Sequence, residues 1–201
     1  MATQRSFRFA MWGMVALVAA ILGLVAYGWV TGQSGTGPLL ADYGKPFKLA
    51  STKGGELDSA SLKGKPYGIF FGFTHCPEVC PATLFDMSTA LKDIGDQGKD
   101  FRLLFITVDP ERDDLATMKD YLSNFDPRIE GLVPTVDQLP QLARDFHIYY
   151  KKVPTSDGSY TMDHTATLFL MDKDGHLART ISYDEPRDTK ESKLKLLLAG
   201  S

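Results

Sequence analysis

Three short apolar runs constrain most strongly what this 201-residue chain can fold into. They lie at residues 65–72 (KPYGIFFG), 101–108 (FRLLFITV) and 165–171 (TATLFLM). Apolar runs of this length, bounded by glycine, proline or charged residues, are typical of strands buried inside a sheet. Buried strands need helices packed over them, so the runs predict an α/β protein.

The residues between and after these runs show helical spacing. Pro81 suits a first helical turn, and Leu84, Met87, Leu91 and Ile94 follow it on one helix face. The patterns predict helices at 81–94, 114–125, 136–146 and 187–198, and further strands at 47–51, 147–153 and 176–182. The turn 172–175 (DKDG) makes the last strand the hairpin partner of 165–171. This order indicates a mixed sheet flanked by helices, of thioredoxin-like type.

An uncharged segment precedes this domain. Residues 9–30 are rich in Ala, Val, Leu and Gly, and as a helix they would extend about 33 Å, enough to span a bilayer core. Trp12 lies at one end and Trp29 near the other, as in the aromatic belts of membrane helices. A cleaved signal peptide is the alternative, but its apolar stretch is normally about 7–15 residues. We therefore expect a single transmembrane helix that stays on the protein as an anchor.

Arg5 and Arg8 predict how the anchor is oriented, because basic flanking residues stay in the cytoplasm. Residues 1–8 are then cytoplasmic, in a single-pass protein of the cell inner membrane. The body of the chain lies in the periplasm, or in the intermembrane space if the protein is mitochondrial. Residues 31–40 begin with TGQSGTGP, which is typical of a flexible linker. Residues 41–201 are long enough for one domain with its own core.

The external part of the chain is acidic. Residues 1–30 contain two of the 22 basic residues and none of the 25 acidic ones, which leaves 20 basic and 25 acidic residues and a net charge of −5. The sequence has no basic stripe, which argues against nucleic acid as a partner.

Cys76 and Cys80 are the only cysteines, four residues apart in FGFTHCPEVCP (71–81). A four-residue step is about one helical turn and places side chains about 5–6 Å apart on one face. Two sulfur atoms so placed close a disulfide or share a soft metal ion. A bridge over so small a loop stabilises a fold little, which favours redox or metal chemistry over a structural disulfide. The helix N-terminus at Pro81 is expected to favour the Cys80 thiolate.

Polar residues from three segments are expected at the carboxyl ends of the strands, where sites form in such sheets. The cysteines follow the first apolar run, DPERDD (109–114) follows the second, and His164 immediately precedes the third. Two thiolates and one imidazole form a three-ligand set with an open position. Such a set suits Cu(I) or an exposed zinc ion.

Two carboxylates are candidates for supporting roles at this site. Asp163 adjoins His164 and is a candidate to hydrogen-bond its ring and so set its tautomer. Asp109, at a strand end, is a candidate to orient a ligand or meet a partner, and a capping or turn role is the alternative.

The other three histidines fit structural roles better. His75 adjoins Cys76, but its side chain is expected to point away from the cysteine pair. His147 is expected in the strand 147–153, and His176, which follows a turn, is expected to face solvent.

Three blocks of the sequence together resemble the Sco/SenC family of membrane-anchored copper proteins: FGFTHCPEVCPATL (71–84), FITVDPERDD (105–114) and DHTATLFLMDKDG (163–175). The resemblance covers about residues 41–190, and the blocks occur in the family's order. It implies a thioredoxin-like fold and copper, as Cu(I), Cu(II) or both, bound by Cys76, Cys80 and His164.

Ordinary thioredoxin-like reductases differ at this site. They have a Cys-x-x-Cys pair and a proline just before the strand that corresponds to 167–171. Here the spacing is Cys-x-x-x-Cys, and Ala166 stands where that proline would be. The smaller residue, with His164 two positions earlier, opens this place to a metal ion.

The resemblance implies a metallochaperone without catalytic residues, which delivers copper to the copper A site of cytochrome c oxidase. The implied partners are the copper A subunit of that oxidase, a copper donor chaperone and a periplasmic thiol reductant. The alternative is a thiol–disulfide oxidoreductase that keeps the copper-site cysteines of the oxidase reduced. The anchor, the fold and the cysteines allow both functions, but the alternative leaves His164 unexplained.

Overall fold

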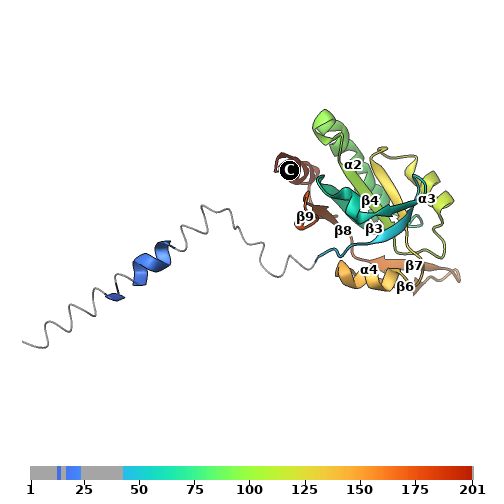
Figure 1. Cartoon of the computed structure of the whole chain (residues 1–201). Coiled ribbons are helices and arrows are strands. Elements are labelled where there is room, and N and C mark those ends of the chain that lie inside the picture. The colour runs from blue at the N-terminus through green and yellow to red at the C-terminus, as the bar shows by residue number, and fades with distance from the viewer. Residues whose placement is uncertain (1–12, 15–16, 24–42, 201) are drawn as a thin grey trace, which may run out of the picture. The chain divides into compact units, whose positions relative to one another are not determined.

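The structure is a computed structural model that describes residues 13–14, 17–23 and 43–200 (Figure 1). The chain divides into two units, residues 1–39 and 40–201. In the first unit, residues 13–14 and 17–23 are helical. The rest of the predicted anchor (9–30), the cytoplasmic segment 1–8 and the linker 31–40 lie outside the described residues. No helix among the described residues has the length and apolar character needed to cross a membrane.

A seven-stranded mixed sheet forms the centre of the second unit (Figure 1). Its strands are β1 (Lys48–Ser51), β2 (Glu56–Asp58), β3 (Tyr67–Gly72), β4 (Arg102–Thr107), β5 (Ile129–Val133), β8 (Thr167–Met171) and β9 (Leu177–Ser182). They lie in the order β2-β1-β5-β4-β3-β8-β9. Strands β3, β4 and β5 are parallel, and the other neighbours pair antiparallel. The predicted mixed sheet is confirmed.

The three apolar runs form the middle of this sheet. Every residue of β3 is buried, and in β4 only Arg102 is partly exposed. Phe70 of β3 pairs with Phe105 of β4 on one side and with Leu168 of β8 on the other. Strands covered on both faces cannot alternate apolar and polar residues, which is why these segments were recognisable in the sequence.

Four helices cover the sheet: α2 (Val79–Ile94), α3 (Leu115–Leu122), α4 (Leu139–Asp145) and α5 (Arg187–Ala199). Two 3-10 turns, η1 (Ser59–Leu62) and η2 (Gly95–Gly98), connect elements. The buried face of α2 contains the predicted Leu84, Met87, Leu91 and Ile94, together with Cys80. Helix α2 therefore holds one cysteine against the core, because that residue shares the stripe that packs on the sheet.

A separate hairpin, β6 (Tyr150–Pro154) with β7 (Tyr160–His164), stands apart from the main sheet. The strand predicted at 147–153 begins only at Tyr150, and placing His147 in it was wrong. His147 has a φ of 51°, in the left-handed region, and its ring packs on Tyr43 with centroids 4.8 Å apart. Strand β7 escaped prediction because most of its residues are not buried, so it lacks an apolar pattern.

Strand β5 also escaped prediction, because Glu130 and Gly131 interrupt its apolar residues. Glu130 is only 1% exposed. It is buried as an ion-pair partner of Arg102, and the hydroxyl of Ser51 donates a 2.5 Å hydrogen bond to it. A buried charge needs such partners, and they come from strands distant in the sequence.

Replacing Gly131 by alanine is expected to destabilise the domain. A Cβ atom there would lie 2.5 Å from Cγ of Met118 and 2.8 Å from Cγ2 of Thr52. Overpacking of this kind costs about 1–3 kcal/mol of the free energy of unfolding, which urea titration measures. Gly200→Ala, whose nearest neighbour is 3.6 Å away, is the control and should change stability by less than about 0.5 kcal/mol. Equal stabilities of the two variants would contradict this packing.

Candidate metal centre

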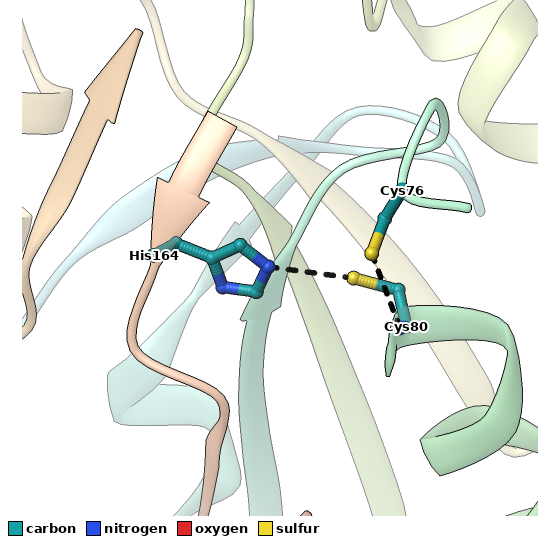
Figure 2. A group of neighbouring side chains, drawn as sticks. All are labelled: Cys76, Cys80 and His164. Carbon is teal, nitrogen blue, oxygen red and sulfur yellow. Dashed lines mark hydrogen bonds between the residues drawn. The ribbon is translucent and has the colours of Figure 1, made fainter. Parts of the chain in front are cut away.

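The structure brings together the three residues predicted as ligands (Figure 2). Cys76 lies in the loop between β3 and α2, Cys80 is the second residue of α2, and His164 ends β7. One ligand atom from each lies within 4.8 Å of the other two. Sγ of Cys80 is 3.7 Å from Nε2 of His164. The loop after β3, the start of α2 and the end of a hairpin much later in the chain thus meet at one point.

The two cysteines are free thiols in different surroundings: Cys76 is half-buried and Cys80 is buried. The backbone N–H of Cys80 donates a 3.4 Å hydrogen bond to Sγ of Cys76. Beneath Cys80 lies Gly72, where a Cβ atom would come within 2.7 Å of its sulfur. A glycine at the end of β3 therefore gives Cys80 the room to pack on the sheet.

The pKa values of the two thiols move in opposite directions. The hydrogen bond from the Cys80 thiol holds the pKa of Cys76 well below its usual range, and the backbone N–H of Cys80 adds to the effect. The same hydrogen bond, together with burial, raises the pKa of Cys80. The expectation that the helix N-terminus favours the Cys80 thiolate was wrong. In the first turn of the helix, the N–H of Cys80 points at Sγ of Cys76, whereas the Cys80 side chain itself is buried in the core.

The ring of His164 is oriented by a backbone carbonyl. Its Nδ1 lies 3.1 Å from the carbonyl oxygen of Thr165. Since a carbonyl only accepts, Nδ1 carries the proton and the lone pair of Nε2 faces the sulfur atoms. The ring of Phe73 packs against the imidazole edge to face, with centroids 5.7 Å apart. Asp163 is exposed, and as the preceding strand residue its side chain points to the opposite face of the hairpin.

This donor set suits a soft metal ion. Thiolates and imidazole bind Cu(I) or zinc well, and three protein ligands leave a position open. The ligands adjoin a groove of about 260 Å³, lined by segment 76–79 on one side and residues 161–164 on the other. A metal ion held here would be reachable by another molecule.

Residues 36–199 of the chain match the SCO1/SenC family. The chain belongs to this family. It is 37% identical over 141 residues to the human "Protein SCO1 homolog, mitochondrial" and 36% identical over 132 residues to "Protein SCO1 homolog 1, mitochondrial" of Arabidopsis thaliana. These matches cover 69% and 65% of this chain but 46% and 40% of the two relatives. The chain thus spans less than half the length of these curated relatives.

Solved structures of SCO1/SenC relatives have the same fold. The structure of Bradyrhizobium japonicum ScoI with copper bound is 45% identical, with a TM-score of 0.71 over 77% of this chain and 99% of that one. Yeast Sco1 with copper bound is 31% identical, with a TM-score of 0.72 over 80% and 90%. The thioredoxin-like mixed sheet with flanking helices is therefore confirmed.

In this SCO1/SenC protein, Asp109 ties the loop after β4 to the hairpin that carries His164. Its carboxylate is 1% exposed and accepts hydrogen bonds from Nε of Arg112 (2.5 Å) and the hydroxyl of Tyr160 (3.0 Å). Arg112 also donates from an NH1 group to the carbonyl of Tyr160 (2.9 Å), and its guanidinium lies 3.7 Å from the centroid of that ring. Asp109 thus contacts the first residue of β7, four residues before the candidate ligand.

Asp113 is a functional candidate that the sequence did not single out. It is fully buried and accepts hydrogen bonds from the backbone N–H and hydroxyl of Thr74 (2.9 and 2.5 Å) and from the hydroxyl of Thr107 (2.6 Å). These bonds fix the backbone two residues before Cys76. The sequence could have pointed to Asp113, because it lies in DPERDD together with the candidate Asp109. Only the tertiary structure shows that the two carboxylates have different partners.

The remaining histidines lie outside the cluster. Nδ1 of His75 is 3.6 Å from Asp113, and the side chain is half-exposed. His176 is exposed beside Asp172, so its predicted solvent-facing position is confirmed. The turn 172–175 is also confirmed by a 3.0 Å hydrogen bond from Gly175 N–H to the carbonyl of Asp172.

The unequal thiols predict unequal reactivity in the reduced, metal-free protein. Iodoacetamide should modify Cys76 first, and the rate should change little between about pH 8 and about pH 6, because a thiol with a lowered pKa is already thiolate there. In Cys80→Ala the donating thiol is gone, so the Cys76 rate should fall about tenfold or more over this range. Mass spectrometry of the alkylated peptides measures both rates. The same pH dependence in both proteins would contradict the hydrogen bond from the Cys80 thiol to Cys76.

Removing the ion pair between Arg112 and Asp109 should destabilise the domain. Arg112→Met leaves the buried Asp109 carboxylate without its cation and should lower the free energy of unfolding by about 3 kcal/mol. In the double variant Asp109→Asn/Arg112→Met the charge is removed as well, so the loss should be smaller than the sum of the single losses by about 1 kcal/mol or more. Urea unfolding of the unmodified protein, Arg112→Met, Asp109→Asn and the double variant gives the coupling free energy. Additive losses would show that the pair does not act as a unit.

Proposed function

We propose that this protein is a copper metallochaperone of cytochrome c oxidase assembly, which binds copper through Cys76, Cys80 and His164. The observation that carries the proposal is the convergence of two thiols and one imidazole within 4.8 Å. The B. japonicum and yeast relatives whose structures hold copper support the choice of metal. Copper also stands above zinc in the affinity order of such ligands.

The three ligands have different roles in binding the copper ion. The Cys76 thiolate is available at neutral pH and meets an incoming ion first. Cys80 must give up its proton when the ion binds, so uptake releases a proton. His164 offers the lone pair of Nε2, because Thr165 holds the other ring nitrogen protonated. The position facing the groove lets a ligand of an acceptor attach before the donor ligands leave.

We place the copper-binding domain, residues 41–201, on the far side of the inner membrane, in the periplasm or in the intermembrane space. Residues 9–30 anchor it and residues 31–40 link it, with residues 1–8 in the cytoplasm. The support is the length of the uncharged segment and the two arginines before it. The proposed partners are the copper A subunit of cytochrome c oxidase, a copper donor chaperone and a thiol reductant, since both cysteines must be reduced before copper binds.

A second function, thiol–disulfide oxidoreductase, is favoured by the unequal thiols. A Cys76 thiolate beside a protonated Cys80 is the arrangement of an attacking and a resolving cysteine. Cys76 would attack a disulfide of the substrate. Cys80 would then close the protein disulfide and release the reduced substrate.

Copper retention tests the first function. Full-length protein is reduced, mixed with Cu(I) or Cu(II) and desalted, and copper is measured per chain. We expect one copper ion per chain in the unmodified protein and essentially none in Cys76→Ser or Cys80→Ser, because thiolates supply most of the affinity. His164→Ala should bind at least about tenfold more weakly, and the control His176→Ala should bind normally.

The outcomes separate the two functions. Unchanged copper affinity in His164→Ala would contradict the three-ligand site. The same preparations, free of copper, are assayed for reduction of a protein disulfide. Catalytic turnover that persists in His164→Ala, without copper retention by any variant, would favour the oxidoreductase.

A further inference from the structure

A pocket lies where β3 and β4 begin, apart from the metal centre. Tyr67 begins β3 and pairs in register with Arg102, which begins β4, and both residues line the pocket. The loop with Cys76 follows the other end of β3. The strand has six residues, so its two ends are roughly 20 Å apart. A molecule in this pocket would therefore leave the groove at the metal centre free.

The pocket has a volume of about 280 Å³, and its charge is mostly of one sign. The domain as a whole has 20 basic and 25 acidic residues, yet four of the five charged residues that line this pocket are basic. Two other lining residues, Leu62 and Tyr67, are buried. Charges of one sign beside apolar walls concentrate the electrostatic potential in a cleft. The charged lining residues are Lys63, Lys65, Lys99, Arg102 and Asp100.

Two of the four cations are already paired within the domain. Nζ of Lys65 lies 3.0 Å from Oδ1 of Asp100. Nη2 of Arg102 donates to the buried carboxylate of Glu130. Arg102 makes no other side-chain hydrogen bond to the residues that the structure describes, so Nε and Nη1 of its guanidinium are available to a ligand.

Lys63 and Lys99 supply the positive charge that is left over. Each follows a four-residue 3-10 turn: the N–H of Lys63, after η1, donates to the carbonyl of Ala60 (3.4 Å), and the N–H of Lys99, after η2, donates to that of Asp96 (3.2 Å). These bonds hold the backbone at both lysines. Neither ammonium group has a hydrogen bond or ion pair to any described residue. Four cations against two carboxylates leave a net charge of +2.

We propose that this pocket binds a terminal phosphate group, as inorganic phosphate or as the head group of a lipid that ends in a phosphate monoester. Such a group carries a charge of about −1.5 to −2 at pH 7, which matches the charge left over in the pocket. Lysine ammonium groups bind phosphate as point charges, and a guanidinium offers its oxygens a fork of N–H donors. The volume lies just below the range of about 300–1,000 Å³ for drug-sized ligands, so it suits a small ion or head group.

Equilibrium dialysis tests the proposal on the reduced, copper-free, full-length protein in a non-ionic detergent. The probe is ³²P-labelled inorganic phosphate. We expect one phosphate per chain, with a Kd of about 1 mM or lower at about 0.15 M salt. Absence of bound phosphate at about 10 mM of the probe would overturn the proposal.

A matched pair of double variants locates the site. Lys63→Ala/Lys99→Ala removes the two unpaired ammonium groups and should weaken phosphate binding about tenfold or more. The control Lys92→Ala/Lys119→Ala removes two exposed lysines from the last turns of α2 and α3 and should change the Kd less than about twofold. Both double variants change the net charge equally. Equal weakening in the two would therefore overturn the pocket as the binding site.

Competition by two soluble lipids distinguishes the sources of the phosphate. Dihexanoyl phosphatidic acid, whose phosphate is terminal, should displace the probe, and dihexanoyl phosphatidylglycerol, a diester, should do so at least about tenfold more weakly. Phosphatidic acid that binds more tightly than inorganic phosphate assigns the site to a lipid, and weaker binding assigns it to the free ion. Equal displacement by the two lipids would contradict recognition of a terminal phosphate.

The experiment is carried out without copper, so its result does not depend on the proposed function. Phosphate binding can be observed even if the copper experiment fails, and copper can be retained normally by a protein that binds no phosphate.

Discussion

The candidate metal centre depends on the buried ion pair between Arg112 and Asp109. Cys76 lies in the loop between β3 and α2, and Cys80 lies in the first turn of α2, the helix that packs on the central sheet. The histidine belongs to a separate hairpin that has no ladder hydrogen bonds to that sheet. Arg112 and Asp109 bridge these parts, since both contact Tyr160 at the start of β7. Because removing one partner of a buried pair leaves an uncompensated charge, this bridge resists opening.

The surroundings of the two thiols give them different roles in the same site. Cys80 packs against Gly72 in the core and keeps its proton, which it shares with Cys76 as a hydrogen bond. Cys76 is half-buried at the groove and carries the negative charge. One sulfur is thus anchored while the other is accessible. This division suits the capture of a metal ion and also thiol exchange, so the imidazole of His164 is what favours the metal.

The groove decides from which side the metal centre can be reached. Segment 76–79 and residues 161–164 form its walls. Cys76 is half-buried at this groove, whereas Cys80 is buried against the core. A molecule that exchanges a ligand with the ion would therefore approach through the groove and meet Cys76 before Cys80.

By itself, the sequence determined the elements whose signal is local. The apolar runs predicted β3, β4 and β8 because strands buried on both faces read as continuous apolar segments, and helical spacing predicted α2 and α5. The cysteine spacing and the family resemblance identified the three candidate ligands. Strand β5 was missed because Glu130 is buried only with Arg102 beside it, and β7 was missed because Met162 is its one buried residue, so it lacks an apolar pattern.

Only the tertiary structure decided which thiol is ionised, how Asp109 and Asp113 divide their roles, and that a hairpin separate from the main sheet brings His164 to the cysteines. Each of these depends on burial and on partners distant in the sequence. Sequence periodicity records whether a residue is apolar, but not which groups surround it.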